Sequence, residues 1–77
     1  MYKITFPCNY EIEIVTDTRR FFFTCDYRYK VVETYILTDE IIKEMTQSNC
    51  YVNVYKIKKV YRYKCNEFIE YVKFMNE

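Results

Sequence analysis

The chain has 77 residues and a formal net charge of +1, so it is too short for two cores and has no strong overall field to attract a polyanion. It contains no glycine and no histidine, which excludes glycine-rich phosphate loops and every catalytic site that depends on an imidazole. Ten tyrosines and six phenylalanines supply the large side chains from which so small a core must be built. We therefore predict a single α+β domain over residues 1–77.

Alternating apolar and polar side chains predict two short strands at the start of the chain. The alternation runs over residues 2–6 and again over residues 10–14, and Pro7 interrupts it between them. The polar residues 17–20 then predict a turn. Because the chain has no glycine, we expect Asn or Asp to occupy any left-handed turn position.

Two longer β-rich segments follow. Residues 21–37 exceed the usual length of a strand, so we expect a break at residues 26–30. Residues 51–64 give the longest alternating pattern in the chain. Lys58 and Lys59 lie at its centre and make a poor two-residue hairpin turn, since such turns favour Asn-Gly or similar pairs. We therefore predict one bent or bulged strand over residues 51–64.

Two helices are indicated by capping residues and helical spacing. Thr38 and Asn66 suit N-cap positions, and the acidic residues after Thr38 lie where the helix dipole favours negative charge. Asn49 suits a left-handed position at the end of the first helix. The apolar residues expected to face the sheet are Ile41, Ile42 and Met45 in the first helix and Phe68, Ile69, Tyr71, Val72 and Met75 in the second. The predicted fold is a small α+β domain with a mostly antiparallel sheet of about five strands and two short helices, in the order β-β-β-β-α-β-α.

The cysteine pattern argues against a metal site. The separations between successive cysteines are 17, 25 and 15 residues, so no close pair exists, and no histidine is present to complete a zinc site. We predict no metal and no cofactor. In a reducing cytoplasm we expect four reduced, mostly buried thiols, at Cys8, Cys25, Cys50 and Cys65. Two disulfides, with three possible pairings, are the alternative.

Few residues suggest catalysis. Ser48 is the only serine and has no base near it in sequence. Glu11 and Glu13 would share one strand face and could bind a hard metal or serve hydrolysis, but we interpret them as a solvated face and a secondary candidate surface for a partner. Cys65 precedes the second predicted helix, whose dipole would lower its pKa, but a structural cysteine is far commoner there. We predict that the protein is not an enzyme.

The segment 51–64 holds the best candidates for binding a partner. They are Tyr55, Lys56, Lys58, Tyr61, Arg62 and Lys64, with Arg28 and Lys30 as secondary candidates if their strand lies alongside. Cations interleaved with aromatic rings are typical of surfaces that bind single-stranded nucleic acid. In one continuous strand, however, the tyrosines would face away from most of the cations, so stacking and charge would not converge. Exposed Tyr and Arg also anchor protein–protein interfaces.

The composition favours a particular class of protein. Its bias toward Lys, Ile, Asn, Tyr and Phe indicates an AT-rich genome, which is typical of phages, other viruses and mobile elements. We expect a non-enzymatic protein that docks stoichiometrically on a host protein or protein–nucleic-acid complex, in the class that includes inhibitors of restriction and CRISPR defence. The alternative is a small nucleic-acid-binding or regulatory module that contacts RNA or DNA through residues 56–64. A homodimer is compatible with both.

The expected location is the cytoplasm, of the host if the gene is viral. No apolar run approaches the roughly 20 residues of a membrane span. The first residues lack the apolar core and cleavage site of a signal peptide. We therefore expect no membrane partner.

Overall fold

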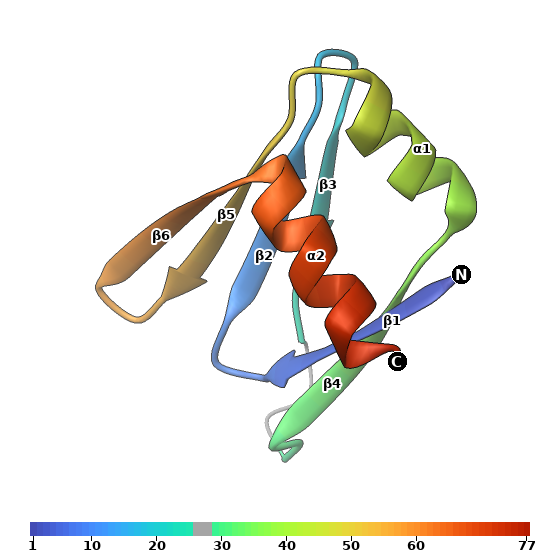
Figure 1. Ribbon diagram of the computed structural model, residues 1–77. Coiled ribbons are helices and arrows are strands. Elements are labelled where there is room, and N and C mark those ends of the chain that lie inside the picture. Colours follow the sequence, from blue (N-terminus) through green and yellow to red (C-terminus); the bar gives the residue numbers. More distant parts are fainter. Residues whose placement is uncertain (26–28) are drawn as a thin grey trace.

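The computed structural model describes residues 1–25 and 29–77, and these form two antiparallel sheets and two helices (Figure 1). The elements in chain order are β1 (Tyr2–Pro7), β2 (Glu11–Val15), β3 (Arg20–Phe23), β4 (Val32–Leu37), α1 (Asp39–Gln47), β5 (Tyr51–Lys56), β6 (Lys59–Lys64) and α2 (Cys65–Met75). The predicted class, a small and mostly antiparallel α+β fold with two short helices, is confirmed. The order β-β-β-β-α-β-β-α contains one strand more than the sequence predicted.

The strands divide into a pair and a larger sheet. β1 pairs with β4, while β3, β2, β5 and β6 form a four-stranded sheet in that order. The predicted interruption at Pro7 is where the chain passes from one sheet to the other, and the amide of Tyr10 donates to the carbonyl of Pro7 at 3.0 Å to close the turn. β3 and β4, which the sequence placed in one interrupted run, therefore lie in different sheets. Of the predicted break at residues 26–30, positions 26–28 lie outside the described residues.

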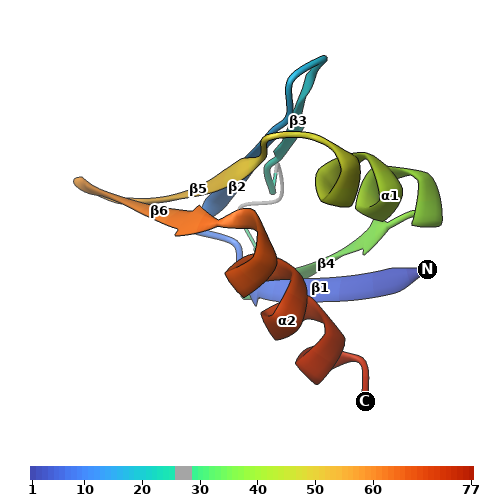
Figure 2. The same cartoon turned by 45° about the horizontal axis from the view of Figure 1, so that its top comes forward.

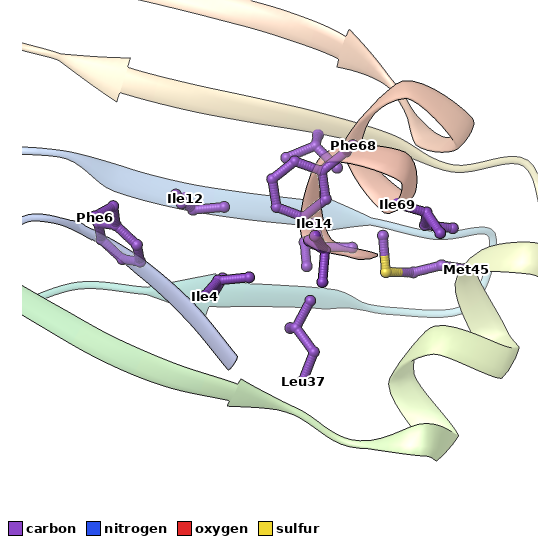
Figure 3. Close-up of a cluster of buried hydrophobic side chains, with 10 residues drawn as sticks. Ile4, Phe6, Ile12, Ile14, Leu37, Met45, Phe68 and Ile69 are labelled. Atoms are coloured by element: carbon purple, nitrogen blue, oxygen red, sulfur yellow. The ribbon is translucent and has the colours of Figure 1, made fainter. Parts of the chain in front are cut away.

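One apolar core joins the two sheets and both helices. α2 lies across one side of the four-stranded sheet and against β1, and side chains from β1, β2, β4 and both helices converge beneath it (Figures 2 and 3). The buried core residues are Ile4, Phe6, Ile12, Ile14, Leu37, Met45, Val52, Phe68, Ile69 and Val72. The predicted apolar side of the second helix is thus confirmed at three buried positions, with Met75 partly buried. Tyr71 was wrongly included, because its side chain is 57% exposed.

The prediction of one bent strand over residues 51–64 was wrong. The chain reverses at Ile57 and Lys58, so that Lys56 pairs with Lys59 and Tyr51 pairs with Lys64. Lys58 has a φ of 64°, and among the described residues it alone has a positive φ. The left-handed position therefore falls on a lysine and not on Asn or Asp, as the sequence had suggested. A left-handed residue costs roughly 1–2 kcal/mol, which the cross-strand pairing of β5 with β6 offsets.

The helix ends confirm one capping prediction and correct two. Thr38 caps α1, since its Oγ1 accepts a hydrogen bond from the amide of Ile41 at 3.3 Å. Asn49 is not left-handed, and its amide donates to the carboxylate of Asp17 at 3.0 Å. Asn66 is not an N-cap, because α2 begins at Cys65 and no side chain caps it. The physical reason is that β6 runs directly into α2, which leaves no loop in which a capping residue could stand.

The cysteines correct a further prediction. Cys8, in the turn after β1, and Cys25, just beyond β3, form a disulfide with their Cα atoms 5.2 Å apart. Cys50 and Cys65 are free and partly buried. Burial, and then a hydrogen bond with the Cys65 thiol, raise the pKa of Cys50 to about 12, so Cys50 remains a thiol at neutral pH. The expectation of four reduced thiols failed because strand pairing brings together cysteines that are distant in sequence.

Candidate functional site

The side of the four-stranded sheet that faces away from α2 carries the most elaborate group of polar and aromatic side chains. Because opposite residues of antiparallel strands point to the same side, the cross-strand partners Phe22, Glu13, Asn53 and Arg62 form one row across all four strands. We call this side of the sheet the open face. Its members are Arg20, Phe22, Glu11, Glu13, Val15, Tyr51, Asn53, Tyr55, Val60, Arg62 and Lys64.

A buried carboxylate organises the centre of the open face. Glu13 Oε1 accepts hydrogen bonds from Asn53 Nδ2 at 2.9 Å and from the Tyr55 hydroxyl at 2.8 Å, and Glu13 Oε2 pairs with Arg20 at 3.2 Å. The hydrogen bond from Asn53 is the main reason that the pKa of Glu13 is lowered, with Tyr55 and Arg20 adding to it against the effect of burial. The same carboxylate raises the pKa of Tyr55. Every polar atom that this group buries therefore has a partner.

Arg62 extends this network toward the edge of the sheet. Its Nε donates to Asn53 Oδ1 at 3.0 Å, and its guanidinium lies over the ring of Tyr51, 4.3 Å from the ring centroid. The two contacts hold the guanidinium over β5, and none of the described residues accepts a hydrogen bond from its terminal nitrogens. None of the described acidic side chains forms an ion pair with Arg62.

Exposed aromatic and apolar side chains lie on the same face as Arg20 and Arg62. Phe22, on edge strand β3, is 49% exposed, and its ring centroid lies 6.2 Å from that of Tyr55. Tyr51 and Val60 are also exposed. The open face therefore combines aromatic and arginine side chains that hydrogen bonds and ring contacts hold in position.

The candidates from the sequence divide between the two sides of the hairpin. Tyr55, Arg62 and Lys64 lie on the open face, whereas Lys56 and Tyr61 point to the other side and Lys58 lies in the turn. The prediction that tyrosines and cations would not converge is wrong for Tyr55 and Arg62. The reversal at residues 57–58 places them on one side of the sheet.

Lys56 belongs to a separate, apolar hollow on the inner side. Its Nζ lies 4.6 Å from the ring centroid of Tyr10 and 4.9 Å from that of Tyr61. Interaction with Tyr10 raises the pKa of Lys56, so the amine stays cationic. The hollow has a volume of about 410 Å³ and lies between α2 and the strands, with Phe6, Phe68 and Lys56 among its lining residues.

Of the secondary candidates, Glu11 and Glu13 lie on the open face and Lys30 does not. Glu11 is exposed on the open face, but the interpretation of Glu13 as solvated was wrong, because the strands on either side cover it. Lys30 pairs with Glu33 at 2.9 Å ahead of β4, outside the four-stranded sheet. Arg28 lies outside the described residues.

Phe22, Asn53 and Arg20 belong to one surface that the sequence did not predict. Asn53 offered the only signal, since a polar residue among valines in a β-rich run suggests a buried partner. That partner, Glu13, is 40 residues away in the chain, so only the strand register identifies it.

Other chemistry has little support in the described part of the chain. Within residues 1–25 and 29–77, no three Asp, Glu or Cys side chains lie close enough together to hold a metal ion. The Cys65 thiol donates to the carbonyl of Met45 at 3.2 Å, which gives it a structural role. No helix among the described residues is both long and apolar enough to cross a membrane.

Comparison with protein-family models, with curated proteins and with solved structures finds no match to this chain.

Proposed function

We propose that the protein is a non-catalytic binding module that docks stoichiometrically on a partner protein through the open face. The observation that carries the proposal is the exposed Phe22, Tyr51 and Arg62 around the buried pair of Glu13 and Asn53. Interface centres are rich in aromatic and arginine side chains. Holding these side chains in place before binding reduces the entropy that docking would cost.

The kind of partner follows from composition. The AT-rich codon bias suggested by the sequence favours a phage or mobile-element gene, and a small binding protein of that origin would act on a host protein. Blocking a defence or regulatory complex requires only surface contact, and the open face offers such a surface. As part of the same proposal, we infer that the protein inhibits a host complex.

Site-specific photocross-linking tests this proposal. A benzophenone amino acid replaces Phe22 on the open face or, as a matched control, Phe74 on α2, which is 71% exposed on another part of the molecule. In cells that carry the gene, the probe at position 22 should give one discrete cross-linked protein, and the probe at position 74 should not. Cross-linking from position 74 alone would contradict the proposal.

Binding to the captured protein then gives the energetics. Phe22→Ser should weaken it by about 2 kcal/mol, roughly thirtyfold, as expected for an aromatic anchor. Phe74→Ser, which removes an even more exposed ring, should leave binding unchanged. Equal losses from the two variants would show that the open face is not the anchor.

A second candidate function has one observation in its favour. The hairpin places Tyr51 and Tyr55 beside Arg62 and Lys64, the combination that single-stranded nucleic-acid binders use. Two carboxylates on the same face, Glu11 and Glu13, and the pairing of Arg20 with Glu13 reduce its attraction for phosphates. Titration with a labelled oligothymidylate at increasing salt separates the two functions, because phosphate contacts weaken steeply as salt rises. The docking proposal predicts no binding at physiological salt.

A further inference from the structure

The β5–β6 hairpin has charge of one sign only. Residues 51–64 contain five basic side chains and no acidic one, although the whole chain is almost neutral. Figures 1 and 2 show the hairpin extending beyond the rest of the molecule, with its turn far from both helices. Every residue of β6 is exposed, and β6 is an edge strand of the four-stranded sheet. The hairpin is therefore a projecting, basic element.

Lysines on an edge strand commonly serve only to prevent aggregation, and this explains Lys59 and Lys64 at the ends of β6. It does not explain Arg62. The guanidinium of Arg62 lies over Tyr51 on β5 and donates to Asn53, so it points across the face and away from the free edge. Its terminal N–H groups form no hydrogen bond with the described residues, and such a stacked arginine has the geometry that binds a carboxylate or phosphate through two parallel hydrogen bonds.

The tip of the hairpin adds apolar surface to this charge. Ile57 is 75% exposed in the turn, and Val60 is exposed on the next strand. Lys58 and Lys59, which lie between them in the chain, are also exposed. An apolar tip with a cationic border complements an acidic surface that contains an apolar depression.

We infer that the hairpin is a docking finger for an acidic protein surface, where a partner carboxylate binds the Arg62 guanidinium and the tip enters an apolar depression. The inference rests on the proposed function and names the chemistry of its partner. A second copy of the chain does not fit. Antiparallel pairing of β6 with itself over its full length would place Lys59 of each copy opposite Lys64 of the other, and like charges directly opposite are destabilising.

The test uses the isotope-labelled protein and a short oligoglutamate peptide as the probe. Amide signals of β5 and β6 and the Nε–H signal of Arg62 should shift on titration, and those of α2 should not. Arg62→Gln should weaken binding at least about tenfold. Arg62→Lys keeps the charge but loses the two-pronged geometry, so it should also weaken binding. Lys73→Gln, the same charge change on exposed α2, is the control and should have no effect.

Even if oligoglutamate binds, three results would overturn the inference. They are shifts that spread equally over α2, full binding by Arg62→Gln, and stronger binding of a matched oligothymidylate than of oligoglutamate, which would identify the partner as nucleic acid. The proposed function is tested separately. If oligoglutamate fails while the Phe22 cross-link persists, only the acidic partner is wrong. If no cross-link forms at position 22, the docking function itself fails, whatever oligoglutamate does.

Discussion

The two sides of the four-stranded sheet are built from the same strands, and they use opposite means of holding side chains in place. On the inner side, Ile12, Ile14 and Val52 are excluded from water beneath α2, and burial of apolar area stabilises them. On the open face, Glu13 and Asn53 are equally inaccessible but are held by hydrogen bonds. The first arrangement tolerates any well-packed apolar set, whereas the second requires particular donors and acceptors.

This contrast separates stability from recognition. Apolar packing is non-directional, so the inner side can hold the fold together without presenting a defined pattern to a partner. Hydrogen bonds are directional, so the open face positions Tyr55 and Arg62 within narrow limits. Substitutions on the inner side should therefore act mainly on folding, and those at exposed positions of the open face mainly on binding.

The largest expected effect is on the inner side. Phe68→Ala should lower the free energy of unfolding by about 3–5 kcal/mol, which is most of what so small a core supplies. Phe74→Ala, on the exposed side of the same helix, should change it by less than about 0.5 kcal/mol. Chemical denaturation measures both. If the two variants melt alike, α2 does not pack as described.

The disulfide should make the next largest contribution to the free energy of unfolding. It joins the turn after β1 to the residues just beyond β3. Replacing Cys8 and Cys25 by Ser should cost about 3 kcal/mol for a loop of this length. Alkylation in denaturant, followed by intact mass, should show two labels without reductant and four after reduction. Four labels without reductant would mean that the bridge is absent in the purified protein.

Breaking the polar centre of the open face should have a smaller effect. Glu13→Ala leaves the Asn53 amide and the Tyr55 hydroxyl without their acceptor and should cost about 1–3 kcal/mol. Glu11→Ala, an exposed carboxylate on the same strand and face, is the control and should be nearly neutral. Thermal melts compare the stabilities of the two variants with that of the wild type. Equal stability would mean that Glu13 is solvated, as the sequence suggested.

Acid should lower the stability of the fold by protonating the Glu13 carboxylate. The folded-state pKa of Glu13 lies below its ordinary value of 4.5, so its contribution to stability is present above pH 4.5 and is lost as the pH falls through the folded pKa. Glu44 behaves likewise, since hydrogen bonds from Arg19, Thr18 and Thr16 lower its pKa to about 2. Stability measured from pH 5 downward should therefore decline less steeply in Glu13→Gln than in the wild type. Parallel curves would contradict a lowered pKa for Glu13.

The smallest effect concerns the turn between β5 and β6, and here the substitution should stabilise the protein. Lys58 has a positive φ, and Asn adopts that conformation more readily. Lys58→Asn should therefore raise the free energy of unfolding by up to about 1 kcal/mol. Lys58→Ala removes the same charge without relieving the backbone and should give no gain. A gain from Ala equal to that from Asn would show that charge, and not backbone conformation, is responsible.

The sequence by itself determined the local structure of this protein. Alternation predicted the strands that became β1 and β2, Thr38 predicted the start of α1, and helical spacing predicted the buried side of α2. Each of these depends on residues within a few positions of one another. The periodicities of strands and helices and the capping of helix ends are local properties, and a short window of sequence contains all the information they need.

Only the tertiary structure decided what the open face contains. An alternating pattern is the same whether a segment runs straight or reverses, and no Gly or Asn marked the turn at Lys58. That reversal moves Arg62 to the side of Tyr51 and Tyr55, which a continuous strand would have kept apart. The burial of Glu13 likewise depends on strands that become neighbours only on folding. Which distant strands pair is set by the shared core, because the whole apolar surface must be buried at once.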